Sequence, residues 1–179
     1  MKSPEGRKLR PTSDRIREAI FDLLGPDTAG RNVLDLFAGT GALGIEALSR
    51  GWHTAVFVDN DRAAQNLIRE NLARCETEHL ARVEPKDVLE FLDRFDAAAP
   101  FDLVLIDPPY RQGLIEQVVD KLTCISGVSA GGYVVCEGER DLKLPAEMGH
   151  LNRIKSRKYG DSSVHIYRCT LVDKESPDG

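Results

Sequence analysis

The sequence contains no apolar run long enough to span a bilayer, which takes roughly 20 consecutive apolar residues. The first six residues, MKSPEG, include no apolar segment of the kind that a secretion signal carries. These two absences argue against a helical membrane protein and against export. We therefore expect a cytoplasmic protein.

Closely spaced metal ligands and cysteine pairs are also missing. The four cysteines and four histidines are scattered along the chain, with no C-x-x-C pair. Close spacing is typical of a disulfide framework or a zinc site, so we expect reduced cysteines and no bound metal. The residues concerned are Cys75, Cys124, Cys136, Cys169, His53, His79, His150 and His165.

Length and composition indicate one globular domain over residues 1–179, with 41% hydrophobic and 30% charged residues. The net charge of −5 does not favour a nucleic-acid partner for the molecule as a whole. Both ends are nevertheless basic. Residues 1–17 hold six basic side chains against two acidic ones, and residues 151–171 hold five against one. The two ends form a basic patch if they meet in space, although ordinary solvated faces explain the charge equally well.

A strand, a turn and a helix at residues 33–48 organise the rest of the chain. Residues 33–37 (VLDLF) are typical of a buried parallel strand, and residues 42–48 (ALGIEAL) are typical of a helix. The glycines of the turn between them, AGTG at 38–41, let the backbone approach a ligand closely. Because a helix N-terminus presents free N–H groups to such a ligand, we expect a nucleotide-like cofactor here.

Gly39, Gly41 and Gly44 also match the dinucleotide fingerprint G-x-G-x-x-G. On its own the fingerprint is weak, and a glycine turn that binds nothing is the alternative. Asp59 directly follows a second predicted strand at 54–58. Doubly wound folds place there the carboxylate that accepts hydrogen bonds from a cofactor ribose, although a plain turn aspartate is the alternative.

The remaining segments alternate between strand and helix patterns. They predict an α/β protein with a doubly wound, Rossmann-like fold and a mixed seven-stranded sheet that ends in an antiparallel strand pair. Residues 1–12 are expected to be an irregular basic segment and residues 172–179 a loose tail. The expected strands are 33–37, 54–58, 81–84, 101–106 and 133–137, with the pair 151–158 and 163–171 joined by Gly160 and Asp161; the expected helices are 14–24, 42–50, 62–74, 88–95 and 114–124.

Ligands of doubly wound sheets bind beyond the carboxyl ends of the strands. The first four predicted strands end at the glycine turn, Asp59, Asp87 and Asp107. We expect these four features to line one crevice.

The segment DPPY at 107–110 indicates the chemistry. Two consecutive prolines cannot continue a sheet, and they fix the backbone rigidly. They can hold the Asp107 carboxylate and the Pro108 carbonyl in set directions, so that both accept hydrogen bonds from an exocyclic amine of a planar ring. Tyr110 can stack on that ring. The alternative is a turn that ends a strand and carries a core tyrosine.

These residues resemble those of a known family. DLFAGTG at 35–41 together with DPPY at 107–110 is similar to the S-adenosylmethionine-dependent amino methyltransferases. RPTSDRIRE at 10–18 and GALGIEALSRG at 41–51 narrow the resemblance to the bacterial small-subunit ribosomal RNA guanine-N2 methyltransferases, and DND at 59–61 and the segment 158–167 also match that family. The resemblance covers residues 7–170. Members usually begin with a further basic, strand-forming segment, R-I-I-G-G-x-x-R-G-R, of which residues 7–9 match only the end.

The resemblance implies that S-adenosylmethionine is the cofactor and that a monomer methylates ribosomal RNA, either free or in the small ribosomal subunit. It implies catalytic roles for Asp107, Pro108, Pro109 and Tyr110. It implies RNA contacts for Arg10, Thr12, Arg15, Arg17, Arg157 and Lys158. Cofactor contacts are expected at Asp35 (near the ammonium group), Phe37, Ala38, Gly39, Thr40, Gly41, Gly44, Asp59 (on the ribose), Asn60, Asp87 (on the adenine amine) and Val88.

Three other interpretations stay open. An NAD-dependent oxidoreductase explains the glycine fingerprint and Asp59 but leaves DPPY without a role. A catalytically idle RNA-binding module is also possible, although both motifs are intact. DPPY is shared with adenine-N6 and protein glutamine methyltransferases, and only the family resemblance favours guanine.

Overall fold

Five strands of the sheet run parallel to one another. They are β1 (Asn32–Leu36), β2 (Thr54–Val58), β3 (Ala81–Glu84), β4 (Phe101–Ile106) and β5 (Val128–Glu139). Four of the five residues of β1 are buried, as expected for a parallel strand covered on both faces. The computed structural model describes residues 11–25, 30, 32–95, 99–109 and 113–171.

Three further strands extend the sheet beyond β5 in antiparallel fashion. They are β6 (Glu147–Met148), β7 (Leu151–Tyr159) and β8 (Ser162–Cys169). β8 pairs with both β5 and β7, and the turn between β7 and β8 is Gly160–Asp161, as predicted. Gly160 has a φ of 56°, a conformation that glycine adopts without strain.

The strand order is β3-β2-β1-β4-β5-β8-β7-β6. The chain runs outward from β1 to β3 and then returns to lay β4 beside β1, so the order reverses between β1 and β4. In an open α/β sheet this reversal opens a crevice at the carboxyl ends of the two strands. Residues 37–41 follow β1 and residues 107–109 follow β4. Both segments therefore lie at the crevice where ligands bind in folds of this kind.

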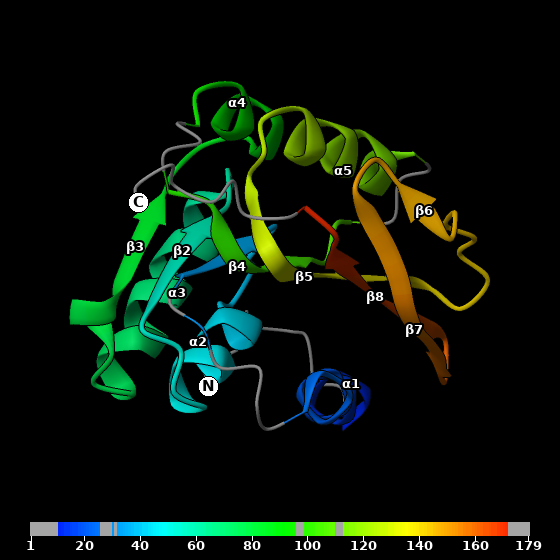
Figure 1. Cartoon of the computed structure of the whole chain (residues 1–179). Helices are drawn as coiled ribbons and strands as arrows, with labels where there is room; N and C mark the ends of the chain where they lie inside the picture. The colour runs from blue at the N-terminus through cyan, green and yellow to red at the C-terminus, as the bar shows by residue number, and fades with distance from the viewer. Residues whose placement is uncertain (1–10, 26–29, 31, 96–98, 110–112, 172–179) are drawn as a thin grey trace.

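Helices cover both faces of the sheet, as Figure 1 shows. On one face α1 (Pro11–Leu24), α2 (Ala42–Ser49) and α3 (Arg62–Arg74) contribute to a core with Val33, Phe57 and Leu105. On the other face α4 (Val88–Asp93) and α5 (Leu114–Cys124) share a second core with Leu34, Val104 and Tyr167. A short 3₁₀ helix, η2 (Glu78–Leu80), precedes β3. Because helices cover the parallel strands on both faces, the crevice at their carboxyl ends is the place where a doubly wound fold offers a ligand site.

The predicted α/β fold class is confirmed, with one correction: the mixed sheet has eight strands and not seven. The additional strand, β6, consists of two residues that pair with β7. A strand of two residues is too short for a hydrophobic period to show in the sequence. β5 begins at Val128 and not at Tyr133, and its register against β4 shifts across the glycine pair at 131–132. α1 begins at Pro11 and not at residue 14, so residues 11 and 12 are helical and not irregular as expected. α4 ends two residues earlier than predicted, at Asp93.

Candidate active site

The glycine turn after β1 contains three residues with positive φ, and only two of them are glycines. Gly39 and Gly41 have φ values of 58° and 76°, and Phe37 has a φ of 60° although it carries a side chain. The Gly41 amide donates to the Ala38 carbonyl at 2.7 Å and closes the turn. A non-glycine residue in this region costs about 1–3 kcal/mol. The rest of the turn therefore holds Phe37 in place.

Two polar side chains of α3 bind backbone carbonyls at this edge of the sheet, one in the turn and one just after β2, and the sequence analysis missed both. The Asn71 amide, fully buried, donates to the Thr40 carbonyl at 2.9 Å. The Gln65 amide donates to the Asp59 carbonyl, also at 2.9 Å. They could have been found as polar residues on the otherwise apolar face of α3, which holds Ile68 and Leu72. Buried amides in such positions stay only where they are hydrogen-bonded.

Asp35 lies beneath the turn and is almost completely buried, with 2% of its surface exposed. Its Oδ2 atom accepts a hydrogen bond from the Gly44 amide at 2.9 Å. Burial, and after it the negative charges of Asp107 and Asp59, hold the pKa of Asp35 well above its usual value, against the Gly44 bond that lowers it. A buried carboxylate that faces two other acids is best satisfied by a positively charged ligand.

Gly44 fits tightly between α2 and β2. A Cβ atom at this position would lie 2.4 Å and 2.8 Å from two ring atoms of the buried Phe57 and 3.0 Å from the Asp35 carboxylate. Gly44 thus lets the helix approach the strand, while Gly39 and Gly41 shape the turn itself. This division of work among the three glycines is the one that the fingerprint implies.

We predict that Gly44→Ala lowers the free energy of unfolding by about 2 kcal/mol, because overpacking against Phe57 outweighs the gain in helix propensity of about 1 kcal/mol. Urea denaturation followed by circular dichroism measures the change. The double variant Gly44→Ala/Phe57→Leu should recover part of the loss, since leucine removes the ring that the new methyl group meets. No loss in the single variant would contradict the packing role.

Asp59 fastens the end of β2 to the glycine turn. Its Oδ2 atom accepts from the Gly39 amide and its Oδ1 atom from the Asp61 amide, both at 2.8 Å. Each carboxylate oxygen keeps a second lone pair for a ligand. The adjacent Asn60 is exposed, and Asp61 caps α3 by accepting from the Ala63 amide at 3.0 Å.

Asp87 and Val88 lie beyond the end of β3. The Oδ1 atom of Asp87 caps α4 by accepting from the Leu89 and Glu90 amides at 2.9 Å and 3.3 Å. Asp87 is exposed, whereas Val88 is buried in the core between α4 and α5. Oδ2 of Asp87 makes no part of this cap, so it is the oxygen available to a ligand.

Asp107 follows β4 and is accessible to solvent, while Pro108 is buried and Pro109 exposed. The surrounding protein still desolvates the Asp107 carboxyl enough to raise its pKa to about 6. Asp107 also acts on the charge of Asp35, so the two acids share one neighbourhood. The structure therefore brings together the glycine turn, Asp59 and Asp107 from three different strands. Tyr110 lies outside the described residues.

Glu137 is a further acid at this edge of the sheet, and the sequence analysis missed it. It lies near the end of β5, is half-buried, and burial together with the charge of Asp107 raises its pKa to about 8. Its signal in the sequence was an acid that ends an apolar run, YVVCE, as Asp107 ends LVLID.

The predicted RNA contacts divide into exposed and paired residues. Arg15 and Arg157 are exposed. Arg17 is half-buried between Asp14 and Glu46, at 2.7 Å and 3.2 Å, and Lys158 pairs with Asp141 at 2.8 Å. Arg10 lies outside the described residues, and of Thr12 only the backbone, in the first turn of α1, is described.

Helix α1, which continues the basic N-terminal end, contacts strand β7 of the basic C-terminal end. The Lys155 ammonium group on β7 donates a hydrogen bond to the Leu23 carbonyl at the end of α1. This contact joins segments more than 130 residues apart in the sequence. Exposed basic side chains of both segments can thus contribute to one surface.

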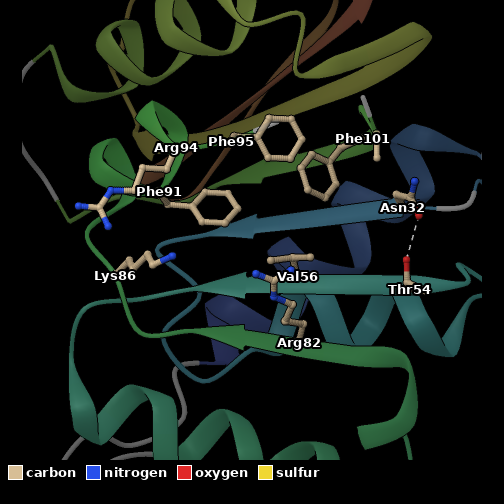
Figure 2. Close-up of a pocket in the computed structure, with 10 residues that line it drawn as sticks. Asn32, Thr54, Val56, Arg82, Lys86, Phe91, Arg94, Phe95 and Phe101 are labelled. Atoms are coloured by element: carbon tan, nitrogen blue, oxygen red, sulfur yellow. Dashed lines mark hydrogen bonds between the residues drawn. The ribbon is translucent and has the colours of Figure 1, made fainter. Parts of the chain in front are cut away.

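A separate cavity of about 420 Å³ lies over the α4 face of the sheet. Figure 2 shows Phe91, Phe95 and Phe101 along it, with Arg82 and Lys86 on the strand side. Its cations are largely paired, since Arg82 and Lys86 both contact Glu84 and Arg94 contacts Glu90. None of its described lining residues belongs to the predicted cofactor set, and Asn32, Thr54 and Phe101 among them stand at the amino ends of their strands.

Two other kinds of site are absent from the described residues. No helix among them is both long and apolar enough to cross a membrane. In the same residues, no group of three or more His, Cys, Asp or Glu side chains is arranged to hold a metal ion.

Known proteins share this architecture and sequence. Ribosomal RNA small subunit methyltransferase D of Escherichia coli (strain K12) is 33% identical over 98% of this chain and 87% of its own length. YlbH of Bacillus subtilis (strain 168) is 36% identical over 94% of this chain and 92% of its own. A solved Streptococcus pyogenes structure, a conserved hypothetical protein, is 37% identical with a TM-score of 0.81, over 86% of this chain and 94% of its own.

The strand order, the glycine turn and the Asp-Pro-Pro segment define the class of S-adenosylmethionine-dependent, Rossmann-like methyltransferases. The family model described as "Conserved hypothetical protein 95" matches residues 1–168. The chain belongs to this family.

The site fits the cofactor of the class. S-adenosylmethionine carries positive charge on its ammonium and sulfonium groups, and Asp35, Asp59 and Asp107 supply negative charge at the crevice. In the described part of the chain no cation appears among the groups that shift the pKa of Asp35 or Asp107. A cationic ligand would offset the negative charge that these acids share.

Proposed function

We propose that this protein methylates the exocyclic N2 amine of a guanine in small-subunit ribosomal RNA, with S-adenosylmethionine as the methyl donor. The observation that carries the proposal is the placement of Asp107 beside Asp35, at the reversal point between β1 and β4. The name of the E. coli relative supports ribosomal RNA as the substrate. Guanine N2 is supported by the family resemblance of residues 10–18 and 41–51.

Side chains of three strand ends hold the cofactor. When bound, S-adenosylmethionine supplies a methyl group on a positively charged sulfur. The buried Asp35 balances the ammonium group, and the glycine turn at 38–41 packs against the methionine part. The free lone pairs of Asp59 accept hydrogen bonds from the ribose hydroxyls. Asp87 accepts from the adenine amine through Oδ2, with Val88 packed in the core behind it.

The Asp-Pro-Pro segment positions the target amine. The base must leave its stack to reach the crevice. Asp107 and the Pro108 carbonyl accept the two amine hydrogens, and Tyr110 stacks on the ring. Asp107 and the Pro108 carbonyl would thereby direct the amine lone pair at the methyl group that the bound cofactor would supply. The proton that the methylated amine loses passes to Asp107. The protein thus contributes mainly position and a proton acceptor.

RNA phosphates lie on the basic surface where α1 meets β7, in contact with Arg15 and Arg157. Arg17 and Lys158 belong to the same surface and also contact RNA phosphates, although each already has an acidic partner. An enzyme of this kind acts as a monomer and works where ribosomal RNA is matured, in the cytoplasm.

RNA binding is expected to be sensitive to salt. If the basic surface neutralises about four phosphates, affinity should fall roughly 100-fold between about 50 and 200 mM salt. The double variant Arg15→Ala/Arg157→Ala should bind more weakly and show a shallower salt slope, whereas the control Arg69→Ala on α3 should keep the wild-type slope. Fluorescence anisotropy with labelled ribosomal RNA measures both. A wild-type affinity independent of salt would contradict the surface.

The acceptor class is tested by labelled methyl transfer onto a mixture of ribosomal RNA, small-subunit particles and their proteins. We expect ribonuclease treatment to remove the label and protease treatment to leave it in place. Label that protease removes would instead indicate a protein glutamine methyltransferase, which shares the same Asp-Pro-Pro-Tyr motif.

A further inference from the structure

Glu137 and Asp107 lie side by side at the carboxyl ends of adjacent parallel strands. The register pairs Ile106 of β4 with Cys136 of β5, so the next residue on each chain is an acid. Leu105 and Val135, two positions earlier, both belong to the core on the α1–α2–α3 face. Because side chains alternate between the faces of a sheet, Asp107 and Glu137 project toward that same face.

The neighbours of this carboxyl pair are acidic or neutral. Asp107 acts on Glu137 from β4, and Ser162 on β8 hydrogen-bonds the Glu137 side chain. On the far side of Asp107, Asp35 of β1 adds a third carboxyl group. In the described residues no cation contributes to the pKa of either member. Two carboxyl groups in such a setting do not both ionise readily, so one of them keeps a proton.

We propose that Glu137 is a positioning residue that holds this proton and donates it in a hydrogen bond to the Asp107 carboxylate. This inference rests on the proposed function and deepens it. The hydrogen bond fixes one oxygen of Asp107, so that the other stays charged and faces the target amine. Ser162 orients Glu137 from the opposite side.

The order in which the two carboxyl groups lose their protons supports Glu137 as the protonated member and Asp107 as the charged one. Glu137 has the higher pKa, about 8, and is half-buried, whereas Asp107 has a pKa of about 6 and is accessible to solvent. The accessible member is therefore the one that ionises first as pH rises. It takes the proton from the methylated amine and returns it to water, while Glu137 keeps its own proton throughout.

The pair predicts a bell-shaped dependence of methyl transfer on pH. The rate rises as Asp107 ionises near pH 6 and falls as Glu137 loses its proton near pH 8. Glu137→Gln keeps a permanent hydrogen-bond donor, so it should stay within about threefold of the wild-type rate at neutral pH and lose the alkaline fall. Glu137→Ala leaves Asp107 without its donor and should lower kcat by about 10- to 100-fold. The control Glu139→Gln, exposed two residues along the same strand, should keep the wild-type bell.

A second measurement decides the pairing without any substrate. Carboxyl carbons labelled with ¹³C in aspartate and glutamate report each titration by NMR in the free protein. Two raised and mutually dependent titrations are expected, and Asp107→Asn should lower the pKa of Glu137. Ordinary, independent titrations of Asp107 and Glu137 would overturn the proposal, and so would a wild-type alkaline limb that persists in Glu137→Gln.

These two measurements separate this inference from the proposed function. Coupled titrations in a protein that does not methylate RNA would refute the proposed function and still support the carboxyl pair. Active RNA methylation with an unchanged bell in both Glu137 variants would refute the role of Glu137 and leave the proposed function standing.

Discussion

Asp107→Ala is expected to lower methyl transfer by about 10³-fold and to leave the affinity for S-adenosylmethionine within a few-fold of wild type. The alanine removes both the acceptor of the target amine and the proton acceptor that follows alkylation, and general-base contributions of this size are typical. Asp107 lies beyond β4 with an accessible side chain, and no described hydrogen bond of the glycine turn depends on it. The glycine turn, Asp35 and Asp59 therefore remain to hold the cofactor, and the loss of one of the three acids changes its affinity only a few-fold.

Single-turnover kinetics and calorimetric titration with the cofactor measure the two effects separately. Asp107→Asn keeps an oxygen acceptor but no charge, so its loss should fall between those of wild type and alanine. Asp120→Asn on α5, an exposed aspartate away from the crevice, serves as the charge-matched control and should behave as wild type. A wild-type rate in Asp107→Ala would contradict the mechanism.

Asp35→Asn is expected to make the protein more stable and its cofactor affinity weaker. In wild type, burial and the neighbouring acids disfavour the Asp35 carboxylate. Asparagine removes that charge, and its Oδ1 atom can still accept from the Gly44 amide. The free energy of unfolding at neutral pH should rise by about 1 kcal/mol, within the usual range for stabilising substitutions. The affinity for the cofactor should fall about 10- to 100-fold, because the ammonium group loses a charged partner.

The contribution of Asp35 to the free energy of unfolding depends on pH. The pKa of Asp35 is raised in the folded protein, so the native state binds a proton more tightly than the unfolded chain does. The contribution of Asp35 to stability therefore falls as pH rises through its native pKa and is recovered as pH falls. Urea denaturation over a pH series should show this trend in wild type and less of it in Asp35→Asn. A destabilised variant with unchanged cofactor affinity would contradict the account.

Much of the fold followed from local patterns in the sequence. The buried strands, the helix caps and the glycine turn each carry a short signal that tertiary packing does not override, and β2, β3 and α3 have the predicted ends. β6 could not be predicted, because a two-residue strand has no period. The early start of β5 was hidden by Gly131 and Gly132, which favour a turn when viewed alone.

The placement of the acids at the strand ends was predictable from the motifs, whereas the contacts that cross the sheet were not. Asp35, Asp59 and Asp107 stand at strand ends, so topology alone brings them together. Asn71 supports the turn from a position 31 residues away in the sequence, and Gln65 supports the backbone of Asp59; only the packed structure reveals these contacts. Glu137 becomes conspicuous only once the register of β4 and β5 sets it beside Asp107. Likewise, Arg17 reads as an RNA contact in sequence, yet in the structure it also joins α1 to α2 through Glu46.

The central claim, methyl transfer to a guanine amine, is tested most directly by identifying the product nucleoside. The protein is incubated with labelled S-adenosylmethionine and small-subunit ribosomal RNA or particles that lack the modification, and the RNA is digested and separated by mass spectrometry. The account predicts that the label appears in N2-methylguanosine and that Asp107→Ala yields almost none. Label in N6-methyladenosine, or in no nucleoside while the cofactor still binds, would contradict it.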